Sequence, residues 1–225
     1  VQSNCVSIVP VETELGRKRA IDQSSCNKDF SCLKGFCPSF VTVAGGQLRR
    51  DAGAGLDLPE LPTPDLPVIA GTHNVVITGI GGTGVVTIGA VLAMAAHVDG
   101  KAASMMEMAG LAQKGGAVHI HCRIAAQAED IAAIRVATGE CDTLLGGDLV
   151  VSAGAGTLGL TTPGRTRAVV NAHEVMTGDF TRDTDFTLPT DRLQHALQAR
   201  LHDRLAMFDA NALAGHLLGD AIYSN

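Results

Sequence analysis

Three cysteines lie close together near the amino end of the chain, and a fourth precedes them. Cys26, Cys32 and Cys37 fall within the stretch SSCNKDFSCLKGFC, and Cys5 lies further upstream. The sequence shows no secretory signal, so we expect a reducing, cytoplasmic compartment, where clustered cysteines are more often metal ligands than disulfide partners. Thiolates are soft donors that suit zinc or iron–sulfur clusters. These four cysteines are therefore the candidate metal ligands.

The spacing of the cysteines favours an iron–sulfur cluster. Zinc ribbons usually use two Cys-x-x-Cys pairs, and this segment has none. Three ligands in one loop with a remote fourth suit a 4Fe–4S cluster, and Pro38 follows Cys37 as it does in bacterial ferredoxins. A structural zinc site and simple reduced thiols stay open as alternatives. Cys122 and Cys141 lie within apolar patterns, so we expect them to be buried thiols.

A glycine-rich loop is the second candidate site. GIGGTG has the G-x-G-x-x-G arrangement, directly after a strand pattern and before a helical one. Such a loop lets backbone approach an anion at the helix N-terminus, although close packing of helix on sheet explains the same glycines without a ligand. Glu107 could supply the acid that a dinucleotide site needs. The candidate residues of this loop are Gly79, Gly81, Gly82, Thr83 and Gly84.

A second loop, GLAQKGGAV, lies between two predicted strands. A Gly-Gly pair behind a lysine can form a backbone nest for phosphate or carboxylate, and an exposed turn is the alternative. We expect the neighbouring strand in the sheet to be the GIGGTG strand. This would favour a ligand site, because ligands gather where loops converge at strand ends. The candidate residues of this loop are Gln113, Lys114, Gly115 and Gly116.

Other polar residues carry weaker signals. His119 and His121 alternate on one predicted strand and so share a face, but two histidines without a third ligand do not define a metal site. Asp148 and the stretch Asn171–Glu174 follow apolar runs, where turn chemistry explains them as well as function does. No catalytic residue can be assigned from the sequence.

Composition limits the classes of partner. The 225 residues are 46% hydrophobic and 18% charged, with a formal net charge of −6. This acidic balance argues against a protein that binds nucleic acid or an anionic membrane. The longest apolar run, Val85–Val98, is too short and too interrupted to span a bilayer.

Alternating strand and helix patterns position the candidate residues. Strands are predicted at NVVITGIGG, KAASMMEM, AVHIHCRIA and RTRAVVNAHEV, with a helix over TGVVTIGAVLAMAAHV. In CDTLLGGDLVVSAG we expect a short helix, a turn, and a strand over Leu149–Ser152. Leu193, Leu197, Leu201 and Leu205 recur every four residues, which predicts one face of a later helix. Together these patterns predict an α/β fold with a mostly parallel, Rossmann-like sheet and helices on both faces, preceded by a small irregular cysteine-rich segment.

Three regions are expected along the chain. Residues 1–46 form the cysteine-rich segment, 47–72 a Pro- and Gly-rich linker that favours extended conformations, and 73–225 the α/β domain. The sequence begins without an initiator methionine, so we expect a segment of a longer protein.

Taken together, the motifs resemble a known family. SNCVSIVPVETELGRKRAIDQSSCNKDFSCLKGFCPSFVTVAGG, GIGGTGVVTIGAVLAMAAHVDGK and MEMAGLAQKGGAV resemble the large fused indolepyruvate ferredoxin oxidoreductases of bacteria, members of the 2-oxoacid:ferredoxin oxidoreductase superfamily. The resemblance covers essentially the whole chain. It implies an internal cysteine motif followed by most of a gamma-type domain, truncated at its C-terminus.

The resemblance also implies an activity. The complete enzyme would oxidatively decarboxylate a 2-oxoacid, with thiamine diphosphate and magnesium held mainly by alpha- and beta-type domains that are not in this chain. Electrons would pass singly through iron–sulfur clusters to ferredoxin, and coenzyme A would take the acyl group. Cys5, Cys26, Cys32 and Cys37 would hold a 4Fe–4S cluster, and both glycine loops would face the thiamine or coenzyme A phosphates.

Partners and alternatives follow from the same resemblance. The expected partners are the missing alpha- and beta-type domains, ferredoxin and a 2-oxoacid, in a homo-oligomer, and this segment alone should have no turnover. A flavin- or NAD-linked reductase module with an iron–sulfur domain is the alternative. A zinc-stabilised binding module is the third possibility.

Overall fold

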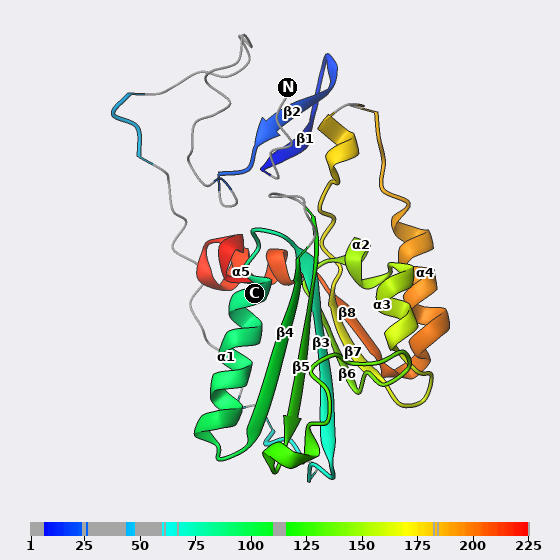
Figure 1. Ribbon diagram of the computed structural model, residues 1–225. Helices are drawn as coiled ribbons and strands as arrows, with labels where there is room; N and C mark the ends of the chain where they lie inside the picture. The colour runs from blue at the N-terminus through cyan, green and yellow to red at the C-terminus, as the bar shows by residue number, and fades with distance from the viewer. Residues whose placement is uncertain are drawn as a thin grey trace.

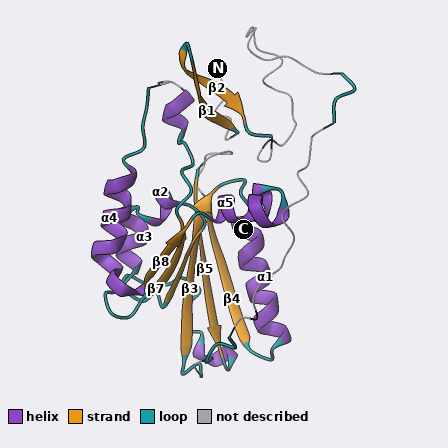
Figure 2. Cartoon of the chain, turned by 180° about the vertical axis from the view of Figure 1, so that it is seen from behind, coloured by secondary structure: helices purple, strands orange, loops and turns teal. Residues whose placement is uncertain are grey.

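The computed structural model shows an α/β domain with a small β-hairpin beside it (Figure 1). It describes residues 7–23, 26, 44–47, 60, 62–66, 68–109, 116–181, 183 and 185–224. Figure 2 shows the same arrangement from behind, with the hairpin beyond one end of the central sheet. None of the described helices is long and apolar enough to cross a membrane.

The central sheet has six strands in the order β4-β5-β3-β6-β7-β8. β3, β6, β7 and β8 run parallel, whereas β5 is antiparallel to both β3 and β4. All strands except β5 therefore point the same way, which confirms the predicted mostly parallel sheet. The strands are β3 (Thr72–Ile80), β4 (Ala102–Ala109), β5 (Ala117–Ala125), β6 (Thr143–Gly146), β7 (Arg167–Asn171) and β8 (Leu205–Phe208).

Helices cover both faces of the sheet, as predicted. One face is covered by α1 (Val85–Val98), and the other by α2 (Leu149–Ser152), α3 (Ala155–Leu160) and α4 (Thr190–Leu201) (Figure 1). A final helix, α5 (Ala210–Leu218), follows β8. The 3₁₀ turns are η2 (Ala128–Asp130), η3 (Gly178–Thr181), η4 (His202–Arg204) and η5 (Ala221–Ser224).

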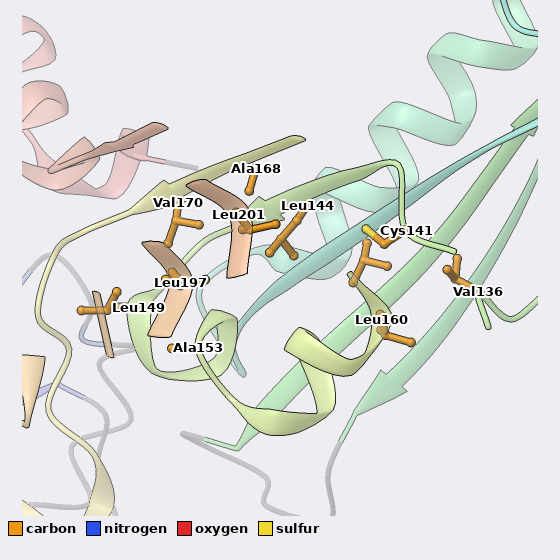
Figure 3. Packing of buried hydrophobic residues seen from close by; sticks show 11 residues of the cluster. Val136, Cys141, Leu144, Leu149, Ala153, Leu160, Ala168, Val170, Leu197 and Leu201 are labelled. Carbon is orange, nitrogen blue, oxygen red and sulfur yellow. The ribbon is translucent and has the colours of Figure 1, made fainter. Parts of the chain in front are cut away.

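The sheet has one hydrophobic core on each of its two faces, beneath the helices that cover it. In β3 consecutive residues are buried, because Val76 faces one side and Val75 and Ile77 face the other. A continuous apolar run of this kind is typical of a strand buried on both faces. Figure 3 shows the core on the α4 side. That core comprises Val76, Val136, Cys141, Leu144, Leu149, Ala153, Leu160, Ala168, Val170, Leu197 and Leu201. The core on the α1 side comprises Val75, Ile77, Val85, Ala96, Val118, Ile120, Cys122 and Ile124.

The thiols of Cys122 and Cys141 are buried in these cores, as expected. Burial raises the pKa of Cys122, and it raises the pKa of Cys141 to about 12. The Cys141 thiol donates a hydrogen bond to the carbonyl of Thr143 at 3.2 Å. A thiol that stays protonated is a poor nucleophile, so both cysteines are packing residues.

The stretch CDTLLGGDLVVSAG folds in the opposite order to the prediction. The strand is Thr143–Gly146, and Leu149–Ser152 forms helix α2. A short apolar run does not distinguish a buried strand from a buried helix, and the local cap decides here. Asp148 is the N-cap, and its Oδ1 accepts a hydrogen bond from the Val151 amide at 2.9 Å.

The predicted leucine face of α4 extends one repeat too far. Leu197 and Leu201 are buried and Leu193 packs against them, but Leu205 already begins β8. The helix ends at Leu201 because the next residue, His202, has a backbone φ of 53°, which interrupts the α-helical path.

A hairpin within the cysteine-bearing region was not predicted. β1 (Ile8–Thr13) pairs with β2 (Gly16–Ile21) in antiparallel register, from Ile8 opposite Ile21 to Thr13 opposite Gly16. Gly16 has a φ of +85°, and the Thr13 hydroxyl accepts a hydrogen bond from the Leu15 amide. Glycine at such a position is what a tight turn requires.

Candidate functional site

The parallel strands bring several loops to one edge of the sheet. Because β3, β6, β7 and β8 all end there, the segments that follow them are neighbours in space. These segments are the glycine loop, Gly147–Asp148, the residues after Asn171, and Asp209. We call this edge the carboxyl edge. Ligands of open α/β sheets bind at such an edge.

The glycines of GIGGTG have different roles. A Cβ on Gly79 would lie 2.3 Å from Cγ2 of Val85, so Gly79 is required for the packing of α1 on β3. A Cβ on Gly81 would lie 3.4 Å from the carbonyl oxygen of Gly116, and the Gly81 amide donates to that oxygen at 2.8 Å. Gly79 and Gly81 therefore hold the loop against α1 and β5.

Gly82 and Gly84 follow in the same loop, at the start of α1. Both have positive φ, 97° and 89°, and a Cβ on Gly82 would meet no atom within 4 Å. Gly84 is the N-cap of α1, with no side-chain cap and no acidic residue in the first turn. The first amides of an α-helix have no partners within the helix and carry partial positive charge. This helix end therefore fits a phosphate or carboxylate.

Gly116 is the one residue of the second candidate loop that the structure describes. Gly116 precedes β5, and β5 is the direct neighbour of β3. The hydrogen bond between Gly81 and Gly116 joins the two loops. Gln113, Lys114 and Gly115 lie outside the described residues.

Glu107 does not occupy the position of a dinucleotide-site acid. It is exposed on β4, opposite Ile120 of β5, and β5 separates β4 from β3. In the dinucleotide-binding arrangement the acid follows a parallel neighbour of the first strand. The expectation for Glu107 is therefore wrong, because an antiparallel strand lies between.

His119 and His121 make separate hydrogen bonds. Nε2 of His119 lies 3.0 Å from the hydroxyl of Thr157, and Nδ1 of His121 accepts the Val136 amide at 3.1 Å. Burial, with smaller contributions from the charges of Arg135 and His119, lowers the pKa of His121 to about 4. Burial also lowers the pKa of His119. These two neutral histidines are structural.

Asp148 is a buried carboxyl at the carboxyl edge. Its residue is 2% exposed, and burial raises its pKa despite hydrogen bonds from the amides of Val151 and Val150. Its Oδ1 caps α2, while its Oδ2 has no hydrogen-bond partner among the described residues. The side chain fixes the loop between β6 and α2, next to the end of β3, where the Gly147 amide donates to Thr78 at 2.7 Å.

The Asn171 side chain makes four hydrogen bonds, whereas the sequence suggested for it no more than a role in a turn. Its Nδ2 donates to Oδ1 of Asn211 at 2.8 Å and to the Gly147 carbonyl at 3.3 Å. Its Oδ1 accepts the amides of His173 and Ala210. One side chain thus ties together the ends of β6, β7 and β8.

A histidine–carboxylate pair lies beside Asn171. Nδ1 of His173 is 3.2 Å from Oδ2 of Asp209, and both side chains are about two-fifths exposed, at 40% and 43%. Burial alone would raise the pKa of Asp209, but hydrogen bonds from the Ala212 amide and from His173 outweigh it and lower that pKa. No pattern in the sequence links these two residues, because 36 residues separate them.

The cysteine cluster is described in part. Cys26 is partly buried, just beyond the end of β2, and Cys5, Cys32 and Cys37 lie outside the described residues. Within the described ranges, no group of three or more His, Cys, Asp or Glu side chains could hold a metal ion.

The two ends of the hairpin lie next to each other. The Asp22 amide donates to the Ser7 carbonyl at 2.8 Å, which closes the hairpin at its open end. Cys5 precedes Ser7 by two residues and Cys26 follows Asp22 by four. At about 3.5 Å per extended residue, the chain can bring both cysteines to one small centre.

Comparison with known proteins gives the family. No match was found among curated protein sequences. Among solved structures, the keto/oxoacid ferredoxin oxidoreductase gamma subunit from Geobacter sulfurreducens is similar at 21% identity over 69% of this chain and 70% of that one, with a TM-score of 0.45. Pyruvate oxidoreductase subunit PORC from Thermotoga maritima is similar at 16% identity, over 69% and 71% of the two chains, with a TM-score of 0.46.

A third structure is much longer than this chain. The 2-oxoglutarate:ferredoxin oxidoreductase from Magnetococcus marinus is similar at 12% identity and a TM-score of 0.48, over 69% of this chain but only 23% of that one. Residues 74–225 match the family described as pyruvate ferredoxin/flavodoxin oxidoreductase, and this match spans most of the chain. The chain therefore belongs to the pyruvate ferredoxin/flavodoxin oxidoreductase family.

Proposed function

We propose that this chain is part of a thiamine-diphosphate-dependent 2-oxoacid ferredoxin oxidoreductase of the indolepyruvate type. In this proposal residues 1–46 carry a 4Fe–4S cluster on Cys5, Cys26, Cys32 and Cys37, residues 47–72 are a linker, and residues 73–225 are the gamma-type domain. The cluster passes electrons to ferredoxin while the complete enzyme converts a 2-oxoacid and coenzyme A into acyl-CoA and carbon dioxide.

The closed hairpin is the observation that carries the cluster assignment. A remote fourth ligand is plausible only if the intervening residues fold back on themselves. The hydrogen bond from Asp22 to Ser7 does this for the segment between Cys5 and Cys26. Four thiolates from one short segment are the usual ligands of a 4Fe–4S cluster.

The glycine loops support a site for a phosphate-bearing cofactor. The uncapped N-terminus of α1, with Gly82 and Gly84 at its entrance, suits a diphosphate such as those of thiamine diphosphate and coenzyme A. Thiamine diphosphate would supply the carbanion chemistry of decarboxylation, and other domains would hold most of it. In this chain Gly82, Thr83 and Gly84, together with Gln113–Gly116, would orient the phosphates.

The position of Glu107 makes the flavin- or NAD-linked alternative less favourable. A dinucleotide site would need an acid beside the end of β3, and Glu107 is two strands away. Glu107 would serve the ribose alone, so retention of flavin or NAD by the purified protein is the direct test of this alternative.

Iron and sulfide analysis of anaerobically purified protein tests the cluster. We expect about four irons per chain, with brown absorbance that dithionite bleaches. Cys26→Ser should lose most of this iron, because serine replaces a soft thiolate with a hard hydroxyl. Cys122→Ala is the matched control: it removes a cysteine from the α1-side core and should leave the iron content unchanged.

Two outcomes would contradict the proposal. Unchanged iron in Cys26→Ser would remove this residue from the ligand set. Stoichiometric zinc with no sulfide in the unmutated protein would favour a structural zinc site.

A further inference from the structure

The β1–β2 hairpin contacts the α/β domain through arginines on one side of β2. Nη2 of Arg19 lies 3.3 Å from the Phe180 carbonyl oxygen, and Nη1 of Arg17 lies 3.4 Å from that of Phe186. Arg17 and Arg19 alternate along the strand, so both project to the same face, and Lys18 between them is exposed. Nε of Arg17 also donates to Oε1 of Glu12 at 2.5 Å, which orients its guanidinium.

Phe180 makes two of the interactions between the hairpin and the α/β domain, both with Arg19. It is only 1% exposed and heads the largest fully buried side chains, yet it belongs to neither core of the sheet. The guanidinium carbon of Arg19 lies 5.7 Å from the centre of its ring, within the range of a cation–π interaction. Arg19 therefore makes two interactions with Phe180: a cation–π contact with the aromatic ring and a hydrogen bond to the backbone carbonyl.

The contact lies on the side of the molecule where the glycine loop opens. Phe180 belongs to η3, in the segment that leaves the carboxyl end of β7 after Asn171. Both views show the hairpin beyond this edge of the sheet, on the side of η3 (Figures 1 and 2). In the sequence, Cys5 lies three residues before β1 and Cys26 lies five residues after β2.

We propose that Arg19 and Phe180 form an intramolecular latch that fixes the β1–β2 hairpin at the carboxyl edge of the sheet. Arg19 is then a positioning residue for electron transfer, because it sets where the cluster lies relative to the glycine-loop site. This role rests on the proposed function, whereas the latch itself does not require a cluster.

Hydrogen exchange measured by mass spectrometry tests the latch. In Arg19→Ala we expect exchange in residues 8–21 and 178–188 to become about tenfold faster, because a charged hydrogen bond and a cation–π contact are both lost. Peptides from β3 should not change. Lys18→Ala is the matched control, since it removes a neighbouring positive charge that points away from Phe180, and it should leave both segments protected.

A second variant keeps the test decisive if Arg19→Ala disturbs folding. Phe180→Leu retains an apolar side chain but removes the ring, so hairpin exchange should increase by a smaller factor, about threefold. Arg19→Lys retains the charge and should restore part of the protection. Unchanged exchange in both Arg19→Ala and Phe180→Leu would overturn the latch, as would equally faster exchange throughout the sheet.

The positioning role has its own readout in the complete enzyme. Arg19→Ala should lose ferredoxin reduction through a lower kcat, with an unchanged KM for the 2-oxoacid, unchanged iron content and an unchanged electron paramagnetic resonance signal of the cluster. A purely structural role would lower iron content together with activity. If the unmutated protein held no iron, the proposed function would fail while the exchange result still decided the latch.

Discussion

Adding one methyl group at Gly79 tests whether packing fixes the glycine loop. In Gly79→Ala the new Cβ would lie 2.3 Å from Cγ2 of Val85, whereas carbon atoms pack at about 3.5–4.0 Å. Val85 is 2% exposed, so its side chain cannot turn towards solvent. The start of α1 would have to move away from β3, and overpacking of this kind costs roughly 1–3 kcal/mol.

Urea denaturation measures this cost. With an m-value of about 2 kcal/mol per molar for a domain of this size, the midpoint should fall by roughly 0.5–1.5 M while m stays constant. The control is Gly159→Ala in α3, where a Cβ meets no atom within 4 Å. That change should be neutral or slightly stabilising, because alanine favours a helix over glycine.

A double-mutant cycle identifies the clashing partner. Val85→Ala removes the methyl group that the new Cβ would meet, so Gly79→Ala should cost much less in the Val85→Ala background. We expect a favourable coupling energy of about 1 kcal/mol or more. A full cost for Gly79→Ala in both backgrounds, or no cost in either, would refute the packing explanation for this glycine.

Two further predictions concern histidines. Because the pKa of His121 falls from 6.5 to about 4 on folding, the unfolded chain binds more protons between these values. Stability is therefore complete above pH 6.5 and is lost towards pH 4, by about 2 kcal/mol between pH 7 and pH 5. His121→Asn, whose Oδ1 can take the place of Nδ1 and accept the Val136 amide, should flatten guanidinium-measured stability over this interval; an unchanged slope would contradict the assignment. His202→Gly should raise the unfolding free energy by about 1 kcal/mol in urea by removing the strain of its positive φ of 53°, whereas His202→Ala, which keeps the strain, should not.

Much of the sheet could be predicted because its strands carry their own signal. Val75, Val76 and Ile77 form a continuous apolar run, as is typical of a strand buried on both faces. Leu149–Ser152 reads the same way, yet it is a helix, because the Asp148 cap and not its hydrophobicity decides its structure. A short apolar run alone therefore does not separate strand from helix; β3 extends over nine residues, whereas the Asp148 cap starts α2.

The candidate site could be predicted only where its residues are close in sequence. The two glycine loops were candidates because of their own spacing, and the expected pairing of β3 with β5 brings Gly81 to Gly116. Asn171 and the pair His173–Asp209 depend on contacts across the ends of β7 and β8, which no spacing encodes. The contact between Arg19 and Phe180 spans 161 residues and was equally invisible.

The antiparallel strand β5 explains why this glycine loop resembles a dinucleotide site without completing one. In a dinucleotide fold a parallel strand lies beside the first, and its carboxyl end brings an acid to the ribose. Here β5 runs the other way, so its amino end lies beside the glycine loop and presents the Gly116 carbonyl to the Gly81 amide. A Cβ on Gly82 would meet no atom within 4 Å, and the N-terminus of α1 has no side-chain cap. Without an acid beside β3, the loop offers a ligand only backbone amides and the N-terminus of α1, which is why the ligand proposed for it is one recognised by its phosphates.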